Sequence, residues 1–248
     1  MELYYNFLAF WILFGALTFL YLIFSKIAAP YGRHQNNKWG WSIENNWGWF
    51  WMELPALLVM PILVIIGPAE IDGYILFILF LWCFHYFYRT VIFPFKLNTK
   101  GKKIPVAIVC SAFIFNLING FFVGYELGFI LENNFSLSPN FIIGVIVFSV
   151  GVYINRTSDN KLISLRSESK EYQIPEGGLF NYISCPNHFG EIIEWLGFAI
   201  ILWNLSALSF VLWTAYNLIP RALNHHQWYK QHFSNYPTSR KAVFPFIF

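Results

Sequence analysis

Residues 176–195 read Glu-Gly-Gly-Leu-Phe-Asn-Tyr-Ile-Ser-Cys-Pro-Asn-His-Phe-Gly-Glu-Ile-Ile-Glu-Trp. The pair Gly177–Gly178 indicates a turn ahead of a short aromatic segment. Ser184 as the cap, with Pro186 in the first turn, predicts the start of a helix. This helix continues into a long apolar run, so the stretch lies where the chain enters hydrocarbon.

Three polar residues of this stretch fall on one face of the predicted helix. At about 100° per residue, Asn187, Glu191 and Glu194 point in nearly the same direction. Acidic residues in a first turn can simply complement the helix dipole. Two carboxyls and an amide together at the edge of a membrane are costly without partners, however, and favour a functional site.

The composition predicts an integral membrane protein. Of the 248 residues, 57% are hydrophobic, 21% aromatic and only 12% charged, which is far more apolar than a soluble domain. We expect a single domain, because no linker or repeat divides the chain. The three cysteines suggest neither a disulfide framework nor a metal site. The net charge of +3 is informative through its distribution along the chain, and we expect no nucleic-acid partner.

Apolar runs predict an all-α protein with seven transmembrane helices. They lie at about 7–29, 49–66, 74–93, 104–130, 137–154, 189–203 and 206–223. The last two come from one long apolar stretch, and a hairpin at 203–206 keeps the later basic residues inside. All 16 Lys and Arg residues then lie at or beyond cytoplasmic ends, whereas the outer loops carry acids such as Glu70 and Glu132. The N-terminus is therefore expected outside and the C-terminus in the cytoplasm.

The candidate functional residues interrupt the apolar pattern near the cytoplasmic ends. Glu53 stands several residues into the second span, where a lone carboxyl should be protonated or strongly hydrogen-bonded. Tyr86 and Arg89 end the third span. Two further stripes follow the fifth and seventh spans at helical spacing: Asn155, Asp159 and Arg166, and Arg221, His225 and Tyr229. With Asn187 and Glu191 they would surround a polar pocket open to the cytoplasm, suited to a phosphate-bearing cofactor.

Taken singly, most of these residues have simpler explanations. Asp159 with Arg166 or Lys161 would suit a solvated salt bridge. Arg89 and Arg221 would suit cations that extend toward water from a helix end. Tyr86 would suit the aromatic belt at a membrane interface. Only the lone carboxyl of Glu53 is hard to explain in this way.

At these positions the chain resembles the steroid 5α-reductase family (3-oxo-5α-steroid 4-dehydrogenase), and we expect a bacterial-type member. The similarity runs from Tyr31 to the C-terminus and rests on several motifs together. These are Glu53-Leu-Pro, His85-Tyr-Phe-x-Arg-Thr90, Gly177-Gly-Leu-Phe-x-Tyr182, Asn187-x-x-Gly-Glu-Ile-Ile-Glu-Trp195, Tyr236-Pro-x-Ser-Arg-Lys-Ala242 and Pro245-Phe-Ile-Phe248.

The resemblance implies an NADPH-dependent enzyme that saturates the 4,5 double bond of 3-oxo-Δ4-steroids. Glu53 and Tyr86 would hydrogen-bond the 3-oxo group as the catalytic pair. The implied cofactor-binding residues are Arg33, Arg89, Asn155, Asp159, Arg166, Tyr172, Asn187, Glu191, Arg221, His225 and Tyr229. Arg166 is our choice for a phosphate contact, because a guanidinium can hold a phosphate with two hydrogen bonds.

Two positions depart from the family pattern. Met52 precedes Glu53 where family members can have Gln, which would remove a polar contact near the substrate. The segment 96–103 is rich in Lys and slightly long, so it supports no phosphate-binding assignment. The chain has no Gly-x-Gly-x-x-Gly after a strand, so the cofactor would not sit on a Rossmann unit.

Other functions stay open from the sequence. A related reductase of enoyl thioesters or polyprenols, or a membrane methyltransferase, would share much of this pattern. A transporter or lipid-binding protein would need polar groups through the whole depth, and the outer half offers only Asn116, Asn119 and Glu126. The expected partners are a steroid-like lipid and membrane lipids, with no obligate protein partner. We expect a multi-pass protein of a bacterial inner membrane or the endoplasmic reticulum, with its cofactor site facing the cytoplasm.

Overall fold

The computed structural model describes residues 1–35, 38–99, 101–131, 138–168 and 171–247. Glu132, Phe248 and the predicted start of the fifth span at residue 137 lie outside this part. The described chain is mostly helical, apart from one small hairpin of β1 (Ser42–Glu44) and β2 (Lys103–Pro105). The two strands are antiparallel, with Ile43 opposite Ile104.

The chain forms two compact units. The first contains Ala29–Ser136 together with Met1, and the second contains Glu2–Ala28 together with Leu137–Phe248. The sequence shows no linker between them, because the second unit takes its first helix from the N-terminus and the rest from the second half of the chain.

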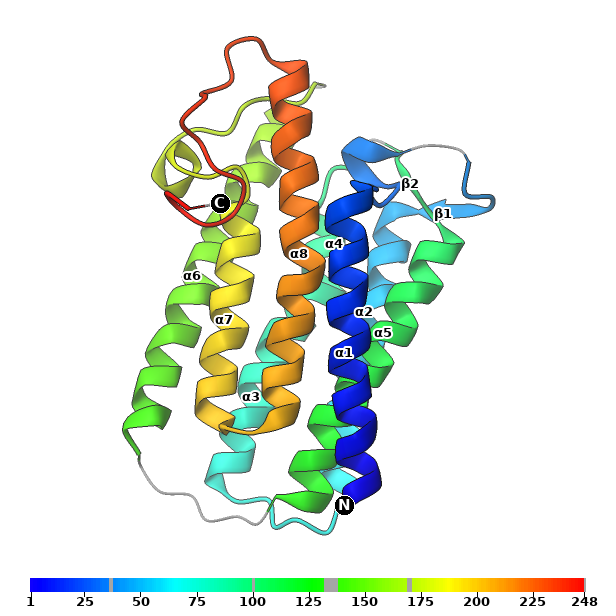
Figure 1. The fold of residues 1–248 in the computed structure, drawn as a ribbon, viewed down its shortest axis with the longest axis vertical. Helices are drawn as coiled ribbons and strands as arrows, with labels where there is room; N and C mark the ends of the chain where they lie inside the picture. The colour runs from blue at the N-terminus through cyan, green and yellow to red at the C-terminus, as the bar shows by residue number, and fades with distance from the viewer. Residues whose placement is uncertain (36–37, 100, 132–137, 169–170, 248) are drawn as a thin grey trace. The chain divides into compact units, whose positions relative to one another are not determined.

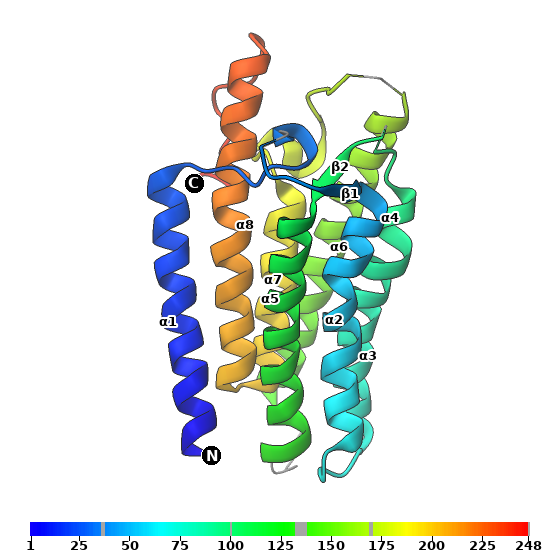
Figure 2. The ribbon, with the colours of Figure 1, turned by 90° about the vertical axis from the view of Figure 1, so that its right-hand side faces the viewer.

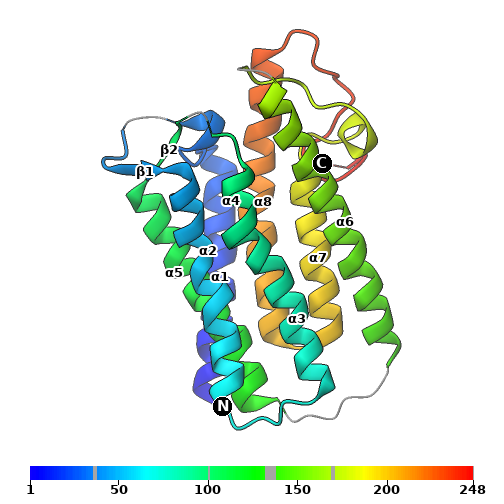
Figure 3. The ribbon, with the colours of Figure 1, turned by 180° about the vertical axis from the view of Figure 1, so that it is seen from behind.

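Three long helical segments build the first unit. They are α2 (Asn45–Ile66), α3 (Gly73–Phe87), which continues through a π-helical turn (Tyr88–Ile92) into α4 (Phe93–Lys96), and α5 (Val106–Tyr125), which continues as a π-helical turn (Glu126–Ile130). α2 lies between α5 and α3 (Figure 3). Gly120 and Gly124 bring α5 close to α2, since a Cβ on Gly124 would lie 2.8 Å from Cα of Met60. Small residues every fourth position permit such close packing of membrane helices.

Four helices build the second unit. They are α1 (Glu2–Ser25), α6 (Pro139–Glu168), α7 (Pro186–Leu202) and α8 (Leu205–His232). α7 lies between α6 and α8 (Figure 1), and α1 runs alongside α8 (Figure 2). The rings of Trp11 on α1 and Trp213 on α8 stack with centroids 4.4 Å apart.

Glycines on both helices bring the backbones of α6 and α7 into contact. Gly144 and Gly151 on α6 face Gly197 and Gly190 on α7, and a Cβ on Gly144 would lie 2.8 Å from the carbonyl oxygen of Gly197. A Cβ on Gly190 would overlap the backbone nitrogen of Asn155. The two helices therefore pack more tightly than pairs separated by ordinary side chains.

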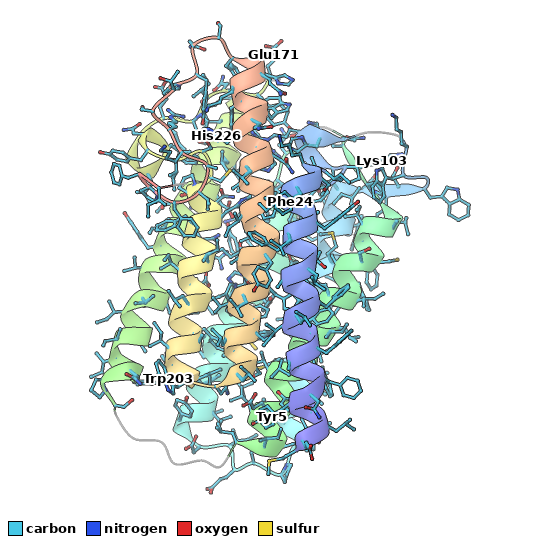
Figure 4. The ribbon with its side chains drawn as sticks, viewed as in Figure 1. Tyr5, Phe24, Lys103, Glu171, Trp203 and His226 are labelled. Carbon is cyan, nitrogen blue, oxygen red and sulfur yellow. The ribbon has the colours of Figure 1, made fainter. Side chains whose placement is uncertain are left out.

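The turn between α7 and α8 confirms the hairpin predicted at 203–206. Trp203 ends α7 in the left-handed region with φ of 48°, and it is visible at the end of α7 in Figure 4. Asn204 then caps α8, because its side-chain oxygen accepts a hydrogen bond from the backbone N–H of Ala207 at 2.9 Å. The structure thus has a helix–turn–helix at the predicted place, and the crossing of the membrane by α7 and α8 stays a prediction.

Within the described residues, five helical segments are long and apolar enough to cross a membrane. They are Glu2–Ser25, Asn45–Ile66, Gly73–Lys96, Val106–Ile130 and Pro139–Glu168. Many large apolar side chains on these helices are exposed, among them Phe7, Phe10 and Phe80. Such surfaces are stable in lipid, so the chain is an integral membrane protein.

Candidate active site

Glu53 in the first unit lies beside a polar residue of a neighbouring helix. The side-chain Nδ2 of Asn116 on α5 donates hydrogen bonds to the carbonyl oxygen of Met52 at 2.7 Å and to Oε2 of Glu53 at 3.3 Å. Asn116 is buried. It therefore lies at the level of Glu53 on the neighbouring helix.

Tyr86 reaches the same level through α3. The indole Nε1 of Trp82 donates a hydrogen bond to the carbonyl oxygen of Ala56 at 2.7 Å, which ties α3 to α2. The two helices run antiparallel, so Glu53 and Tyr86 each lie about one turn from this bond in the same direction. The ring of Tyr86 packs on that of Trp82, with centroids 4.8 Å apart, and the side chain is buried. The predicted catalytic pair thus occupies one level of the first unit.

Arg89 and Arg33 also belong to the first unit. Arg89 is in the π-helical turn, a distortion often found at functional sites. Its guanidinium lies over the rings of Trp49 and Phe93, 5.1 Å and 4.5 Å from their centroids. Arg33 lies in the short 3-10 helix Gly32–His34. The packing of Arg89 between aromatic rings provides a structural role independent of any ligand.

In the second unit, α6 and α7 bring four of the predicted cofactor residues together. Nδ2 of Asn155 donates to the carbonyl oxygen of Asn187 at 3.0 Å and to Oε2 of Glu191 at 3.4 Å. Nδ2 of Asn187 donates to Oδ1 of Asp159 at 3.2 Å. The glycine contact between Gly190 and the backbone of Asn155 allows these short side chains to meet.

This network contains one buried acceptor without a described hydrogen-bond partner. Oδ1 of Asn155 has no hydrogen-bond partner in the described part of the chain, although Asn155 is only 1% exposed. Buried acceptors are nearly always paired, because an unpaired one loses its hydration without compensation. A bound molecule with an N–H or O–H group would satisfy it.

The other predicted cofactor residues of the second unit lie on α6, on α8 and in the segment after α6. The Arg166 guanidinium lies 5.5 Å from the ring centroid of Tyr172, and Tyr172 packs on Trp228 of α8 at 5.0 Å. His225 on α8 faces His188 on α7, with ring centroids 5.8 Å apart. Tyr229 is buried and stacks on Tyr236. Arg221 lies one turn before His225 on the same helix.

Known proteins resemble the chain over nearly its whole length. The model of the 3-oxo-5-alpha-steroid 4-dehydrogenase family matches residues 102–248. The chain is 40% identical over 233 residues to "Steroid 5-alpha-reductase DET2" of Arabidopsis thaliana, covering 90% of this chain and 88% of that protein. It is 35% identical over 242 residues to "3-oxo-5-alpha-steroid 4-dehydrogenase 1" of Rattus norvegicus, covering 94% and 92%.

The chain belongs to this family. As a member of the 3-oxo-5-alpha-steroid 4-dehydrogenase family it is an oxidoreductase of the class that acts on CH–CH bonds. The relatives above come from a plant and a mammal, so they give no support to the expected bacterial type.

One cluster in this family member was missed by the sequence analysis. The Ser184 hydroxyl shares hydrogen bonds of 2.6 Å with Nδ1 of His226 and with the hydroxyl of Tyr236. The prediction that Ser184 caps α7 is wrong, because Cys185 is the N-cap and makes no side-chain cap bond, although Pro186 does begin the helix. A Ser two residues before Pro looks like a cap in sequence, and the distant His and Tyr give no local signal.

The same cluster attaches the C-terminal segment to the stretch before α7. The backbone N–H of Lys241 donates to the carbonyl oxygen of Tyr182 at 2.9 Å, and the N–H of Ser184 donates to the carbonyl oxygen of Lys241 at 2.9 Å. Nη1 of Arg240 donates to the carbonyl oxygen of Pro175 at 2.9 Å. The C-terminal motif at residues 236–242 therefore fixes the segment that leads into α7, the helix that carries Asn187 and Glu191.

His226 should make the stability of this cluster depend on pH. It lies on α8 beyond the last predicted span and is labelled in Figure 4. Burial, with the nearby positive charges of Lys230 and Lys241, lowers the pKa of His226 from 6.5 to about 4. Between these values the unfolded chain binds a proton that the folded chain does not, so folding stability falls as pH drops through this window.

We expect the melting temperature to fall less in His226→Asn than in wild type between about pH 7 and about pH 4.5. The Asn side chain can still accept from Ser184 but does not titrate. Thermal unfolding of the detergent-solubilised proteins would measure this. Equal falls in the two proteins would show that His226 does not contribute the pH dependence.

Proposed function

We propose that this chain reduces the 4,5 double bond of a 3-oxo-Δ4-steroid to the 5α-product with NADPH as the hydride donor. The observation that carries the proposal is the placement of a carboxyl, Glu53, and a phenol, Tyr86, at one level of two apolar helices. The names of the relatives support the same reaction, since they are steroid 5-alpha-reductases and 3-oxo-5-alpha-steroid 4-dehydrogenases.

In the proposed reaction, Glu53 in its neutral form and Tyr86 donate hydrogen bonds to the 3-oxo group of the substrate. These two hydrogen bonds stabilise the negative charge that develops on the 3-oxo oxygen as the enolate forms. Hydrogen bonds of this kind are strong in apolar surroundings. NADPH, when bound, would supply the hydride for C5. A proton from solvent or a relay then adds to C4 and completes the saturated product.

The second unit offers groups that suit this cofactor. The unpaired Oδ1 of Asn155 can accept from a carboxamide or ribose donor. The carboxylates of Asp159 and Glu191 suit ribose hydroxyls, and Arg166 and Arg221 suit phosphates. The same cofactor role is proposed for the remaining residues of the predicted set: Arg33, Arg89, Tyr172, Asn187, His225 and Tyr229.

The proposed topology has seven spans, with the N-terminus outside and the C-terminus and cofactor site facing the cytoplasm. α6 has 30 residues and is therefore about 45 Å long, which exceeds the hydrocarbon thickness of about 30 Å. Its last turns, which carry Asp159 and Arg166, can then extend into the cytoplasm. α7 has only 17 residues, so it would cross with little tilt.

The experiment that tests the proposal measures NADPH binding and steroid turnover by the purified protein. We expect oxidation of NADPH with testosterone or progesterone and formation of the 5α-product. Asn155→Leu should raise the NADPH Kd about tenfold or more, because it removes both a donor and an acceptor from the buried network. Asn119→Leu is the matched control, since Asn119 is also buried but bonds to its own helix at Phe115, and its NADPH Kd should equal that of wild type.

Two results would overturn parts of the proposal separately. A wild-type protein that does not bind NADPH would refute the reductase function. A protein that binds NADPH but leaves both steroids unchanged would refute the steroid substrate, and another enone or enoyl lipid would then be tested in the same assay.

A further inference from the structure

We propose that Asn116 is a positioning residue for Glu53, which fixes the carboxyl group and makes Oε1 the oxygen that carries its proton. The inference rests on the proposed function, in which Glu53 acts as a neutral hydrogen-bond donor to the substrate. It adds a residue from α5 and states which oxygen of Glu53 donates.

The orientation of the Asn116 amide follows from its partners. Nδ2 lies 2.7 Å from the carbonyl oxygen of Met52 and 3.3 Å from Oε2 of Glu53. A backbone carbonyl can only accept, so the group facing it must be the NH2 of the amide and not its oxygen. The NH2 has two hydrogens and can serve both acceptors at once. The hydrogen bond to Met52 therefore orients the Asn116 amide so that its NH2 group faces Glu53.

The proton of Glu53 is assigned by the same argument. An oxygen that accepts from an N–H group uses a lone pair, and in a neutral carboxylic acid the carbonyl oxygen is the better acceptor. Oε2 faces Asn116 and is therefore the carbonyl oxygen, so the hydroxyl is Oε1. The donor that polarises the substrate would then have one fixed position on the carboxyl group.

The close packing of α2 against α5 restricts the distance between Asn116 and Glu53. Gly120, one turn after Asn116, brings the helices together so that a Cβ there would lie 3.3 Å from Cβ of Val59. Met52 is itself buried in an apolar cluster with Tyr31, Ile104 and Val109. The Met52 side chain thus has apolar neighbours, and the polar contact to the Glu53 carboxyl comes from Asn116 on α5.

Two substitutions separate positioning from simple packing. Asn116→Leu has similar volume but no donor, so we expect kcat to fall about 10- to 100-fold while KM for the steroid changes little. Asn116→Asp keeps the shape and changes the donor into a titrating group. When the introduced carboxyl is neutral, its O–H can donate to Oε2 as the amide does; when it is ionised, it accepts the Glu53 proton and withdraws it from the substrate.

The decisive readout is the pH profile of kcat. We expect Asn116→Asp to be inactive at high pH and to recover as pH falls, with an additional titration limb that is absent from wild type and from Asn116→Leu. Other titratable groups on the elements packed against α2 are His85 and Tyr86 on α3, Arg89 on the turn Tyr88–Ile92 and, further along, Glu126 on the turn after α5. They are the same in all three proteins. Asn119→Leu again serves as the control and should keep the wild-type kcat.

The outcomes distinguish this inference from the proposed function. If Glu53→Gln retains wild-type turnover, the acid role of Glu53 is refuted, and so is the positioning role of Asn116. If Glu53→Gln is inactive while both Asn116 variants turn over as wild type at every pH, only the positioning role is refuted. NADPH binding by each variant reports folding, and if Asn116→Leu does not fold, the pH profile of Asn116→Asp decides.

Discussion

Glu53→Gln is expected to lower kcat about 10²- to 10⁴-fold, the range typical for loss of a positioned acid. Gln keeps the size of the side chain and an N–H donor, but its amide is a much weaker acid than a carboxyl group. Tyr86→Phe should cost about 10²- to 10³-fold, as removal of one donor to a developing oxyanion does. Both variants should bind NADPH as wild type does, because Glu53 and Tyr86 are proposed to contact the steroid and not the cofactor.

A matched control is available in the same unit. Glu126 is a buried carboxyl on the π-helical turn that follows α5, whereas Glu53 is half-buried. Glu126→Gln makes the same chemical change as Glu53→Gln. Its kcat should stay near that of wild type. Equal loss of activity in Glu53→Gln and Glu126→Gln would mean that the carboxyls on these helices support the fold of this unit and that Glu53 has no special role in catalysis.

Features determined by local sequence were the most predictable. The turn at 203–206 followed from the distribution of basic residues, and the structure adds that Asn204 caps the helix after it. The polar stripe of Asn155 and Asp159, and that of Asn187 and Glu191, followed from helical periodicity. The two stripes depend on residues within a few turns of one another, and the turn on charges along one chain, so no knowledge of the tertiary structure was required.

Contacts between distant helices could not be predicted in this way. Asn116 and Glu53 are 63 residues apart, and their hydrogen bond depends on how far α5 is shifted along α2. Ser184 was misassigned as a cap for the same reason, because its hydroxyl is taken by His226 and Tyr236 from later parts of the chain. A pattern in one segment contains no information about the register between segments.

Gly190→Ala is expected to damage both stability and cofactor binding in the second unit. The added Cβ would overlap the backbone nitrogen of Asn155, so α6 and α7 would have to move apart. Overpacking of this kind costs about 1–3 kcal/mol, and the melting temperature should fall by several degrees. The NADPH Kd should rise at the same time, because the bond from Asn155 to the carbonyl oxygen of Asn187, now 3.0 Å, would lengthen as the helices separate.

The control for this change is Gly73→Ala. Gly73 begins α3 in the first unit, and a Cβ added to it would meet no described atom within 4 Å, so its substitution should leave both measurements unchanged. Because Gly190 has no side chain of its own to contact a cofactor, any loss of NADPH affinity in Gly190→Ala must act through the spacing of the helices. A variant that melts earlier but binds NADPH with wild-type affinity would therefore show that the Asn155–Asn187 contact is not part of the cofactor site.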